Sequence, residues 1–218
     1  MRKLKIASIL FLIILISACS NTTSELEFEK EVMQEIFPSM IDSIWVNNKI
    51  SFDRNILKYT KSGSLSKHSN KSREYYNQKL VEIRQDSLRI FVIISDKVFP
   101  FYEDQSILTK HFKTPIIIKN TNDTLDYEID TSKFSQPKYL NIKFISKFEK
   151  IERFEVFNHP NYINGILSFS RIKFDSKKHY GILTVNSMIK LSGIGYTVFI
   201  KKENDKWLID KLQEFIIN

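Results

Sequence analysis

The C-terminal part of the chain decides the fold, and it opens with the stretch Ile166-Leu-Ser-Phe-Ser-Arg-Ile-Lys-Phe174. Apolar and polar residues alternate along this stretch, which indicates a β-strand with both faces partly covered. Three more strands are predicted after short polar turns, at Tyr180–Ile189, Tyr196–Lys201 and Trp207–Ile209. Four successive strands joined by short turns predict an antiparallel meander.

Shorter strands are predicted upstream of the meander. Leu88–Ile94 is a compact run rich in Ile and Val that predicts a buried strand, and Tyr139–Ile145 alternates between apolar and polar residues. Ile116–Lys119 and Asp126–Ile129 are expected to form a hairpin across the turn at residues 120–124.

A helical pattern comes before the strands. Ser24 and Glu27 form the S-x-x-E pattern of a capping box, which predicts the start of a helix. The apolar residues that follow have helical spacing and define one buried face, at Leu26, Val32, Met33, Ile36, Met40 and Ile44. Pro38 falls within this stripe and is expected to break or kink it into two helices. The predicted fold class is therefore α+β, with N-terminal helices packed on a mainly antiparallel sheet that ends in a four-strand meander.

Length and composition are those of an ordinary globular protein. The chain has 218 residues, of which 42% are hydrophobic and 27% are charged, and this argues against general disorder or a coiled coil. A polytopic membrane protein is also excluded, because no segment after the N-terminal leader supplies the roughly 20 uninterrupted apolar residues of a spanning helix.

The first residues have the order of a secretory signal. Three basic residues precede an apolar run from Ile6 to Ile16, which only Ser8 interrupts, and small residues follow. As a helix this run would be about 16 Å long, against a hydrocarbon core of roughly 30 Å, so it is too short for a comfortable permanent span. We predict a signal peptide at residues 1–18, a short tether at residues 19–24 and a single α+β domain at residues 25–218.

The end of this signal, Ile16-Ser17-Ala18-Cys19, resembles the lipobox of bacterial lipoprotein precursors. The resemblance implies that Cys19 is the lipidation site and the mature N-terminus, with a diacylglycerol on the sulfur and often a fatty acid such as palmitate on the amine. Cys19 is also the only cysteine, so it has no disulfide partner within the chain. Each buried methylene contributes about 0.8 kcal/mol, and two or three acyl chains therefore anchor a protein permanently.

Charge and the residue after the cysteine indicate a location. Loss of the three basic residues of the signal lowers the formal net charge from +8 to +5, and without a basic-aromatic motif we expect no nucleic-acid partner. In lipoprotein families a serine in the position of Ser20 generally goes with transport to the outer membrane, and Glu25 and Glu27 come too late to form an acidic export tag. We therefore expect a cell-envelope protein that is lipid-anchored to the outer membrane and faces the periplasm.

A search for catalytic and metal-binding motifs leaves one candidate. The chain has no G-x-S-x-G, H-E-x-x-H, C-x-x-C or P-loop pattern, and no two histidines are three or four residues apart. Gly193-Ile-Gly195 lacks a third glycine and is expected to be a turn or bulge. Asp96, Glu103, Asp104 and His111 could converge as acid and base or on a metal, although we expect an ordinary surface loop. No catalytic residue, metal or cofactor is therefore predicted.

Basic residues accumulate between Asp53 and Lys79, where they could settle on anionic lipid headgroups. The expected interpretation is solvated lysines, with a loop around Lys61–Asn70. The segment after this loop has helical spacing of its large side chains, although it could also enter a strand; these residues are Tyr75, Tyr76, Leu80 and Ile83.

Three functions remain open at this level. The preferred one is a non-enzymatic lipoprotein whose body binds a partner protein or an envelope component. The second is a lipid-tethered hydrolase that uses groups between Asp96 and His111. The third is a binding protein whose curved sheet encloses a small ligand. The C-terminal strands around Trp207, about the last 50 residues, are similar to the curved sheets of cystatin-like and NTF2-like folds, and this similarity concerns the fold and transfers no ligand or reaction.

Overall fold

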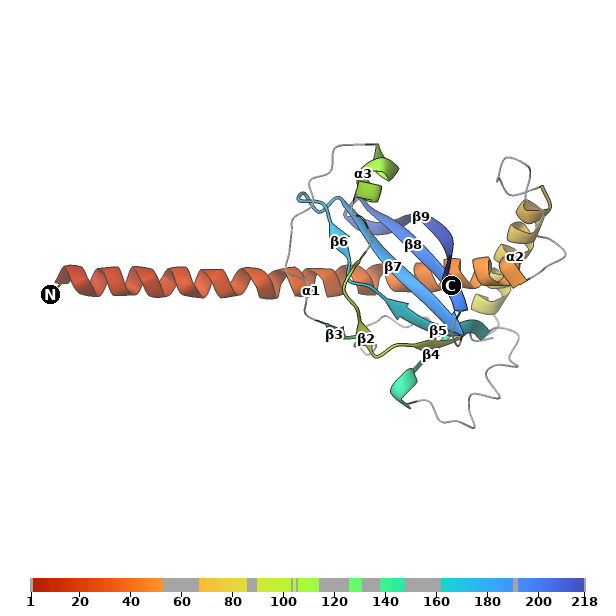
Figure 1. Ribbon diagram of the computed structural model, residues 1–218, viewed down its shortest axis with the longest axis horizontal. Helices are drawn as coiled ribbons and strands as arrows, with labels where there is room; N and C mark the ends of the chain where they lie inside the picture. The colour runs from red at the N-terminus through yellow and green to blue at the C-terminus, as the bar shows by residue number, and fades with distance from the viewer. Residues whose placement is uncertain are drawn as a thin grey trace.

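The structure is a computed structural model that describes residues 2–52, 67–85, 90–102, 104, 106–113, 126–130, 138–147, 162–189 and 192–217. It has the predicted α+β architecture, with N-terminal helices packed on a mixed, mostly antiparallel sheet (Figure 1). The side chains of the first helix are described from Glu25 to Ile50.

Helix α1 (Arg2–Phe52) is a single helix of 51 residues. Its first half projects away from the body, and its second half lies across the sheet (Figure 1). The helix does not start at the predicted capping box of Ser24, and residues 19–24, predicted as a tether, are part of it. Once a helix has nucleated, each further residue adds a hydrogen bond at little cost, so a few small polar residues do not interrupt it.

The predicted break at Pro38 is wrong, because α1 continues through this residue. A proline inside a helix costs about 3 kcal/mol through its missing N–H and its ring. Its neighbours Phe37, Met40 and Ile41 are at most 1% exposed, and burial of each of these side chains contributes about 1.5–3 kcal/mol. Packing against the sheet therefore outweighs the cost of the proline.

The main sheet contains seven strands, and six of them follow the order β4-β1-β5-β7-β8-β9, while β6 pairs with β7. Their bounds are β1 Ile90–Ile94, β4 Leu140–Phe144, β5 Tyr162–Phe169, β6 Lys173–Phe174, β7 Tyr180–Ile189, β8 Ser192–Glu203 and β9 Lys206–Ile217. Strand β1 is parallel to β4 and β5, whereas β5, β7, β8 and β9 pair in antiparallel fashion. The predicted four-strand meander is therefore confirmed.

A second sheet has two strands, β2 (Lys97–Val98) and β3 (Tyr127–Glu128), which pair in antiparallel fashion. The sequence predicts that the β3 segment pairs with Ile116–Lys119, but that segment and its turn lie outside the described residues. A short 3-10 helix, η1 (Ile145–Lys147), follows β4.

The predicted strand at residues 166–174 is two strands, β5 and β6, because the chain leaves the regular ladder at Ser170. The Ser170 Oγ accepts the Thr184 N–H at 2.8 Å and donates to the Arg171 carbonyl at 2.9 Å. A serine hydroxyl that binds backbone groups in this way competes with the strand ladder. Both halves still pair with β7.

Gly193 and Gly195 lie inside β8 and not in a turn or bulge, so that prediction is wrong. The Phe215 ring on β9 lies over Gly195, where a Cβ atom would come within 2.2 Å of the ring. A glycine inside a strand often marks such a close approach. Here the aromatic ring covers the position that a side chain would otherwise fill.

Both faces of the meander are covered, as predicted. On one face α1 packs against the sheet, and the Phe37 ring lies 5.6 Å from that of Phe169 between centroids. On the other face helix α3 (Ser106–Phe112) buries Leu108 against Ile182 and Phe199. The larger core therefore lies between α1 and the sheet.

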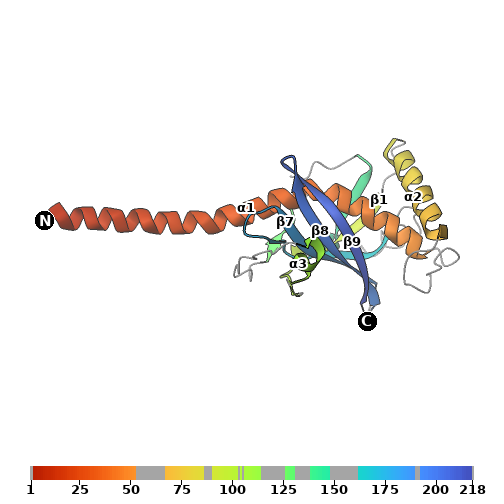
Figure 2. The same ribbon diagram turned by 90° about the horizontal axis from the view of Figure 1, so that it is seen from above.

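Helix α2 (Lys67–Gln85) packs against the C-terminal part of α1 (Figure 2). The helical spacing predicted from Tyr75 to Ile83 is confirmed. The loop predicted around Lys61–Asn70 ends earlier than expected, because the helix already begins at Lys67. Arg84 of α2 forms an ion pair with Asp42 of α1. Helix α2 therefore lies at the end of the body that is farthest from the N-terminus (Figure 1).

Candidate functional site

The groups predicted to converge between residues 96 and 111 do not form one site. The Asp96 carboxylate accepts hydrogen bonds from the N–H and the hydroxyl of Ser146. Asp104 caps α3, where the Ser106 hydroxyl and then the Ser106 N–H, at 2.8 Å, lower the pKa of its carboxyl. Glu103 lies outside the described residues.

His111 belongs to a different contact, which ties α3 to β8 and β9. Its ring stacks on Phe199 with centroids 3.9 Å apart, and its Nε2 lies 2.7 Å from Asp210 Oδ2. Asp96 and His111 border separate hollows of the surface. Within the described ranges no group of three or more His, Cys, Asp or Glu side chains comes together as a metal site would require.

Replacement Asp210→Asn is expected to lower the free energy of unfolding by about 0.5–1 kcal/mol near pH 7, the usual range for partly exposed pairs. Hydrogen bonds, first from Lys201 and then from His111, lower the pKa of Asp210 in the folded protein. This contribution is complete above the unfolded-state pKa of about 3.9 and is lost as the pH falls through the folded-state pKa. Urea unfolding near pH 7 and at about pH 3 should therefore show a difference that shrinks at low pH.

Asp205→Asn is the control for this measurement, because the Asp205 side chain is 98% exposed and pairs only with Lys202 at the surface. It should change the free energy of unfolding little at either pH. A loss of stability in Asp210→Asn that does not depend on pH would contradict the role assigned to its charge.

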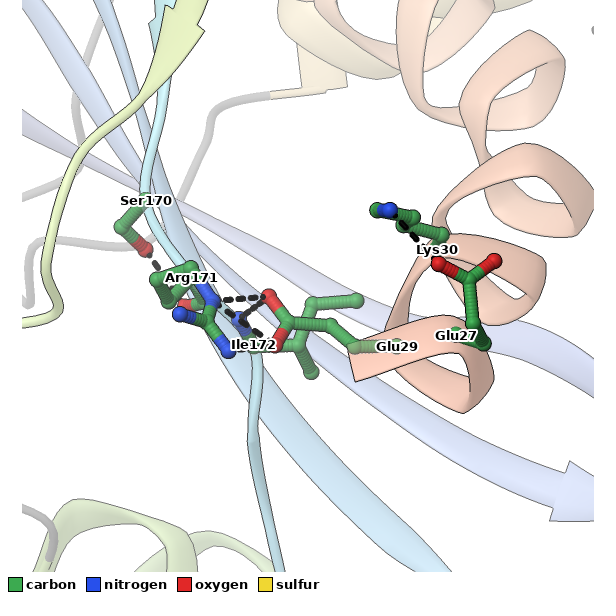
Figure 3. Close-up of polar contacts among 6 residues, drawn as sticks. All are labelled: Glu27, Glu29, Lys30, Ser170, Arg171 and Ile172. Carbon is green, nitrogen blue, oxygen red and sulfur yellow. Dashed lines mark hydrogen bonds and ion pairs between the residues drawn. The ribbon is translucent and has the colours of Figure 1, made fainter. Parts of the chain in front are cut away.

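A buried ion pair joins α1 to the segment between β5 and β6 (Figure 3). Arg171 donates to Glu29 Oε2 from Nε at 2.8 Å and from Nη2 at 2.6 Å. The Ile172 N–H donates to Glu29 Oε1 at 2.9 Å. The side chains of Glu29 and Arg171 are only 4% and 7% exposed. Such short charge-assisted bonds offset much of the hydration that both groups lose on burial.

Tyr127 and Lys173 complete the surroundings of the pair. The Arg171 guanidinium lies 5.4 Å from the centroid of the Tyr127 ring on β3, within cation–π range. Burial, and then the Glu29 carboxylate, raises the pKa of the Tyr127 hydroxyl. Burial lowers the pKa of Lys173, and the charge of Glu29 opposes this change.

A small hollow of about 180 Å³ opens beside the ion pair. Three bases and three acids contribute to its walls, and these are Arg171, Lys173, Lys178, Glu25, Glu29 and Asp175. Because these charges balance, the hollow has no excess charge to select a cation or an anion. We therefore interpret the Glu29–Arg171 pair as a clamp that fixes the start of the packed part of α1 on the sheet.

The clamp is not predicted from the sequence, although one signal for it is present. Glu29 precedes Val32 and Met33 by three and four residues, so it falls on the apolar stripe of α1. A charged residue on a buried stripe requires a partner of opposite charge. Arg171, which lies in the stretch Ile166–Phe174, carries that opposite charge.

Cys19, the predicted lipidation site, lies in the projecting half of α1, where the structure describes the backbone. In the described part of the chain we find no helix that combines the length and the apolar character needed to cross a membrane. Lipidation of Cys19 stays a prediction from the sequence.

Comparisons with known proteins give no relative. No protein-family model matches the chain, no curated protein is significantly similar to it, and no solved structure matches it. The similarity of the C-terminal strands to cystatin-like and NTF2-like sheets thus stays a prediction. The function of this protein must be argued from its own residues and contacts.

Proposed function

We propose that the protein is a lipoprotein of the bacterial cell envelope, anchored to the outer membrane through Cys19 and facing the periplasm. The order of the first 19 residues carries the proposal: basic residues, a short apolar run and a lipobox that ends at the only cysteine. A lone thiol in an oxidising compartment needs a chemical fate, and thioether lipidation gives it one. Ser20 supports the outer membrane as the destination.

The course of α1 supports an anchor that is joined directly to the body. The helix runs from the leader through Cys19 into the core. Its hydrophobic contacts with the sheet begin at Phe28 among the described side chains. Cleavage before Cys19 would therefore remove projecting residues and leave the packed half of α1 intact.

We further propose that the body binds a partner protein or another envelope component and is not an enzyme. Asp96, Asp104 and His111 each serve a separate structural contact, and this favours binding over the acid–base chemistry of a hydrolase. Large side chains such as Trp45 and Tyr196 fill the space between α1 and the sheet. A filled core favours contact with a partner over enclosure of a small ligand.

Separation of the two membranes tests the proposed location. The full-length protein should accompany the outer-membrane fraction on a density gradient, and protease added to intact cells should leave it uncut. Recovery in the inner membrane would contradict the destination, and cleavage in intact cells would contradict the periplasmic orientation. In-cell crosslinking of the membrane-bound protein should add a discrete species of higher mass, which a protein without a partner would not form.

A further inference from the structure

We infer that one end of the body faces the bilayer and that its lysines contact anionic phospholipid headgroups. This anchor-side end consists of Phe28 and two turns, the β6–β7 turn at residues 175–179 and the β8–β9 turn with its flanks at residues 201–206. The inference rests on the proposed lipid anchor and adds the orientation in which that anchor holds the body.

The two turns and the start of the packed part of α1 come together at the anchor-side end. The Lys178 Nζ lies 4.0 Å from the centroid of the Phe28 ring. The Lys202 N–H donates to the His179 carbonyl at 2.8 Å and joins the two turns. The ring centroid of Phe174, next to the β6–β7 turn, lies 5.1 Å from that of Phe28. The projecting half of α1 leaves the body on this side (Figure 1).

The chain between the proposed anchor and this end is short. Phe28 is the ninth residue after Cys19, and a helix covers that interval in about 14 Å at 1.5 Å per residue. Even a fully extended chain would cover only roughly 30 Å. Acyl chains on Cys19 therefore keep the anchor-side end nearer to the headgroups than any part of the body farther along α1.

Charge at the anchor-side end favours an anionic surface. The two turn segments carry five lysines against three carboxylates, which are Asp175, Glu203 and Asp205. Asp175 is buried, and its carboxylate accepts backbone N–H groups of its own turn, including that of His179 at 2.7 Å. Glu203 and Asp205 are exposed but pair with Lys201 and Lys202. On α1, Glu27 pairs with Lys30 at 2.7 Å, and Glu25 borders the hollow that Lys178 also lines. The lysines in excess at this end are therefore Lys177 and Lys206.

Lys177 and Lys206 are the lysines most open to headgroups. Both are exposed, and neither forms an ion pair with another described residue. In contrast, Lys201 pairs with Glu203 at 2.8 Å, and Lys202 with Asp205 at 3.3 Å. Each free base near an anionic surface shifts the orientation roughly fivefold, which corresponds to about 1 kcal/mol.

The basic residues of α2 are excluded as the bilayer contact by their place in the fold. Helix α2 lies at the opposite end of the body (Figures 1 and 2). Arg73 of α2 donates to the Asn47 side chain at 2.7 Å, and Asn47 is 19 residues farther along α1 than Phe28. That interval is roughly 28 Å of helix, well beyond the Debye length of about 8 Å at physiological salt. Helix α2 is therefore a matched control surface.

Fluorescence quenching in vesicles tests the orientation. The lipidated mature protein is reconstituted into vesicles of phosphatidylglycerol and phosphatidylcholine that contain a headgroup-linked quencher. Ser176→Cys places a single thiol for a fluorophore on the β6–β7 turn, and Asn77→Cys places one on α2; both positions are exposed. We expect quenching of the label at position 176 and little quenching of the label at position 77.

Charge variants then test the lysines. Lys177→Gln combined with Lys206→Gln should lower the preference for this orientation roughly 25-fold. Added salt should also lower this preference, because it screens the lysine charges. Lys71→Gln combined with Lys79→Gln removes the same charge from α2 and should leave quenching unchanged. Stronger quenching at position 77, or equal effects of the two double variants, would overturn the inference.

The experiment also separates this inference from the proposed anchor. The only native cysteine carries lipid in the proposed form, so the protein without an added cysteine should take up no fluorophore. Labelling of that protein would reveal a free thiol at Cys19 and contradict the anchor itself. A blocked thiol with no quenching at position 176 would retain the anchor and refute the orientation.

Discussion

The Cys19→Ser variant should leave the membrane fraction and appear in the soluble fraction. Two acyl chains of about 15 methylenes each contribute on the order of 20 kcal/mol of membrane affinity at about 0.8 kcal/mol per methylene. A serine hydroxyl has no thiolate to accept the diacylglycerol as a thioether. Fractionation and intact-protein mass, measured on the same samples, should show loss of the membrane-bound form together with loss of the lipid mass.

Ser20→Ala is the matched control for this substitution, because it alters the neighbouring residue and keeps the sulfur. This variant should stay in the membrane fraction and retain the lipid mass. If Cys19→Ser kept both its membrane association and its mass, the lipoprotein assignment would be wrong.

Arg171→Met should lower the free energy of unfolding by about 3–5 kcal/mol, because it leaves the Glu29 carboxylate buried without its counter-charge. The double variant Glu29→Met/Arg171→Met removes both charges and should recover part of this loss. Recovery should be incomplete, because the Ile172 N–H also loses its acceptor. The free energy of unfolding of the wild type, the single variant and the double variant is measured by urea titration, with tryptophan fluorescence as the signal.

Lys30→Met provides the control for the clamp. Lys30 follows Glu29 on α1 and pairs with Glu27 at 2.7 Å (Figure 3). Its Nζ also lies 5.8 Å from the centroid of the Tyr127 ring. Loss of the ion pair, about 0.5 kcal/mol, and of the partly exposed cation–π contact, about 0.5–1 kcal/mol, should together cost well below the loss expected for Arg171→Met. Equal effects of Lys30→Met and Arg171→Met would show that burial of the clamp has no energetic consequence. If Arg171→Met fails to fold, solubility of the double variant gives the same comparison.

The bounds of a strand could be predicted where polar turn residues mark both of its ends. β7 has the predicted bounds, Tyr180–Ile189, because polar turns interrupt the apolar pattern at both ends. β8 starts before its predicted first residue, Tyr196. From the sequence alone Gly195 indicates a turn, but in the fold the Phe215 ring of β9 covers this glycine and the strand continues through it. The effect of Pro38 could not be predicted locally either, because burial of the neighbouring residues in the fold decides whether the helix continues.

The candidate sites differ in how local their signals are. The residues that predict lipidation of Cys19 are contiguous, so this prediction needs no knowledge of the fold, and it stays a prediction. Glu29 and Arg171 are 142 residues apart, and no local pattern can pair them. The opposite error arises for Asp96 and His111, which are close in sequence and which the fold carries into separate contacts.

The long helix α1 also affects the order in which the fold can be completed if the protein is exported as we propose. The helix is synthesised first, yet it packs against β9, which ends at Ile217. In the proposed export, its apolar stripe would cross the membrane before its partner strands are present. A topology with such high contact order folds slowly and leaves apolar surface open to aggregation in the meantime. Until the last hairpin is available, that stripe needs cover, which in the proposed location a chaperone or the bilayer would provide.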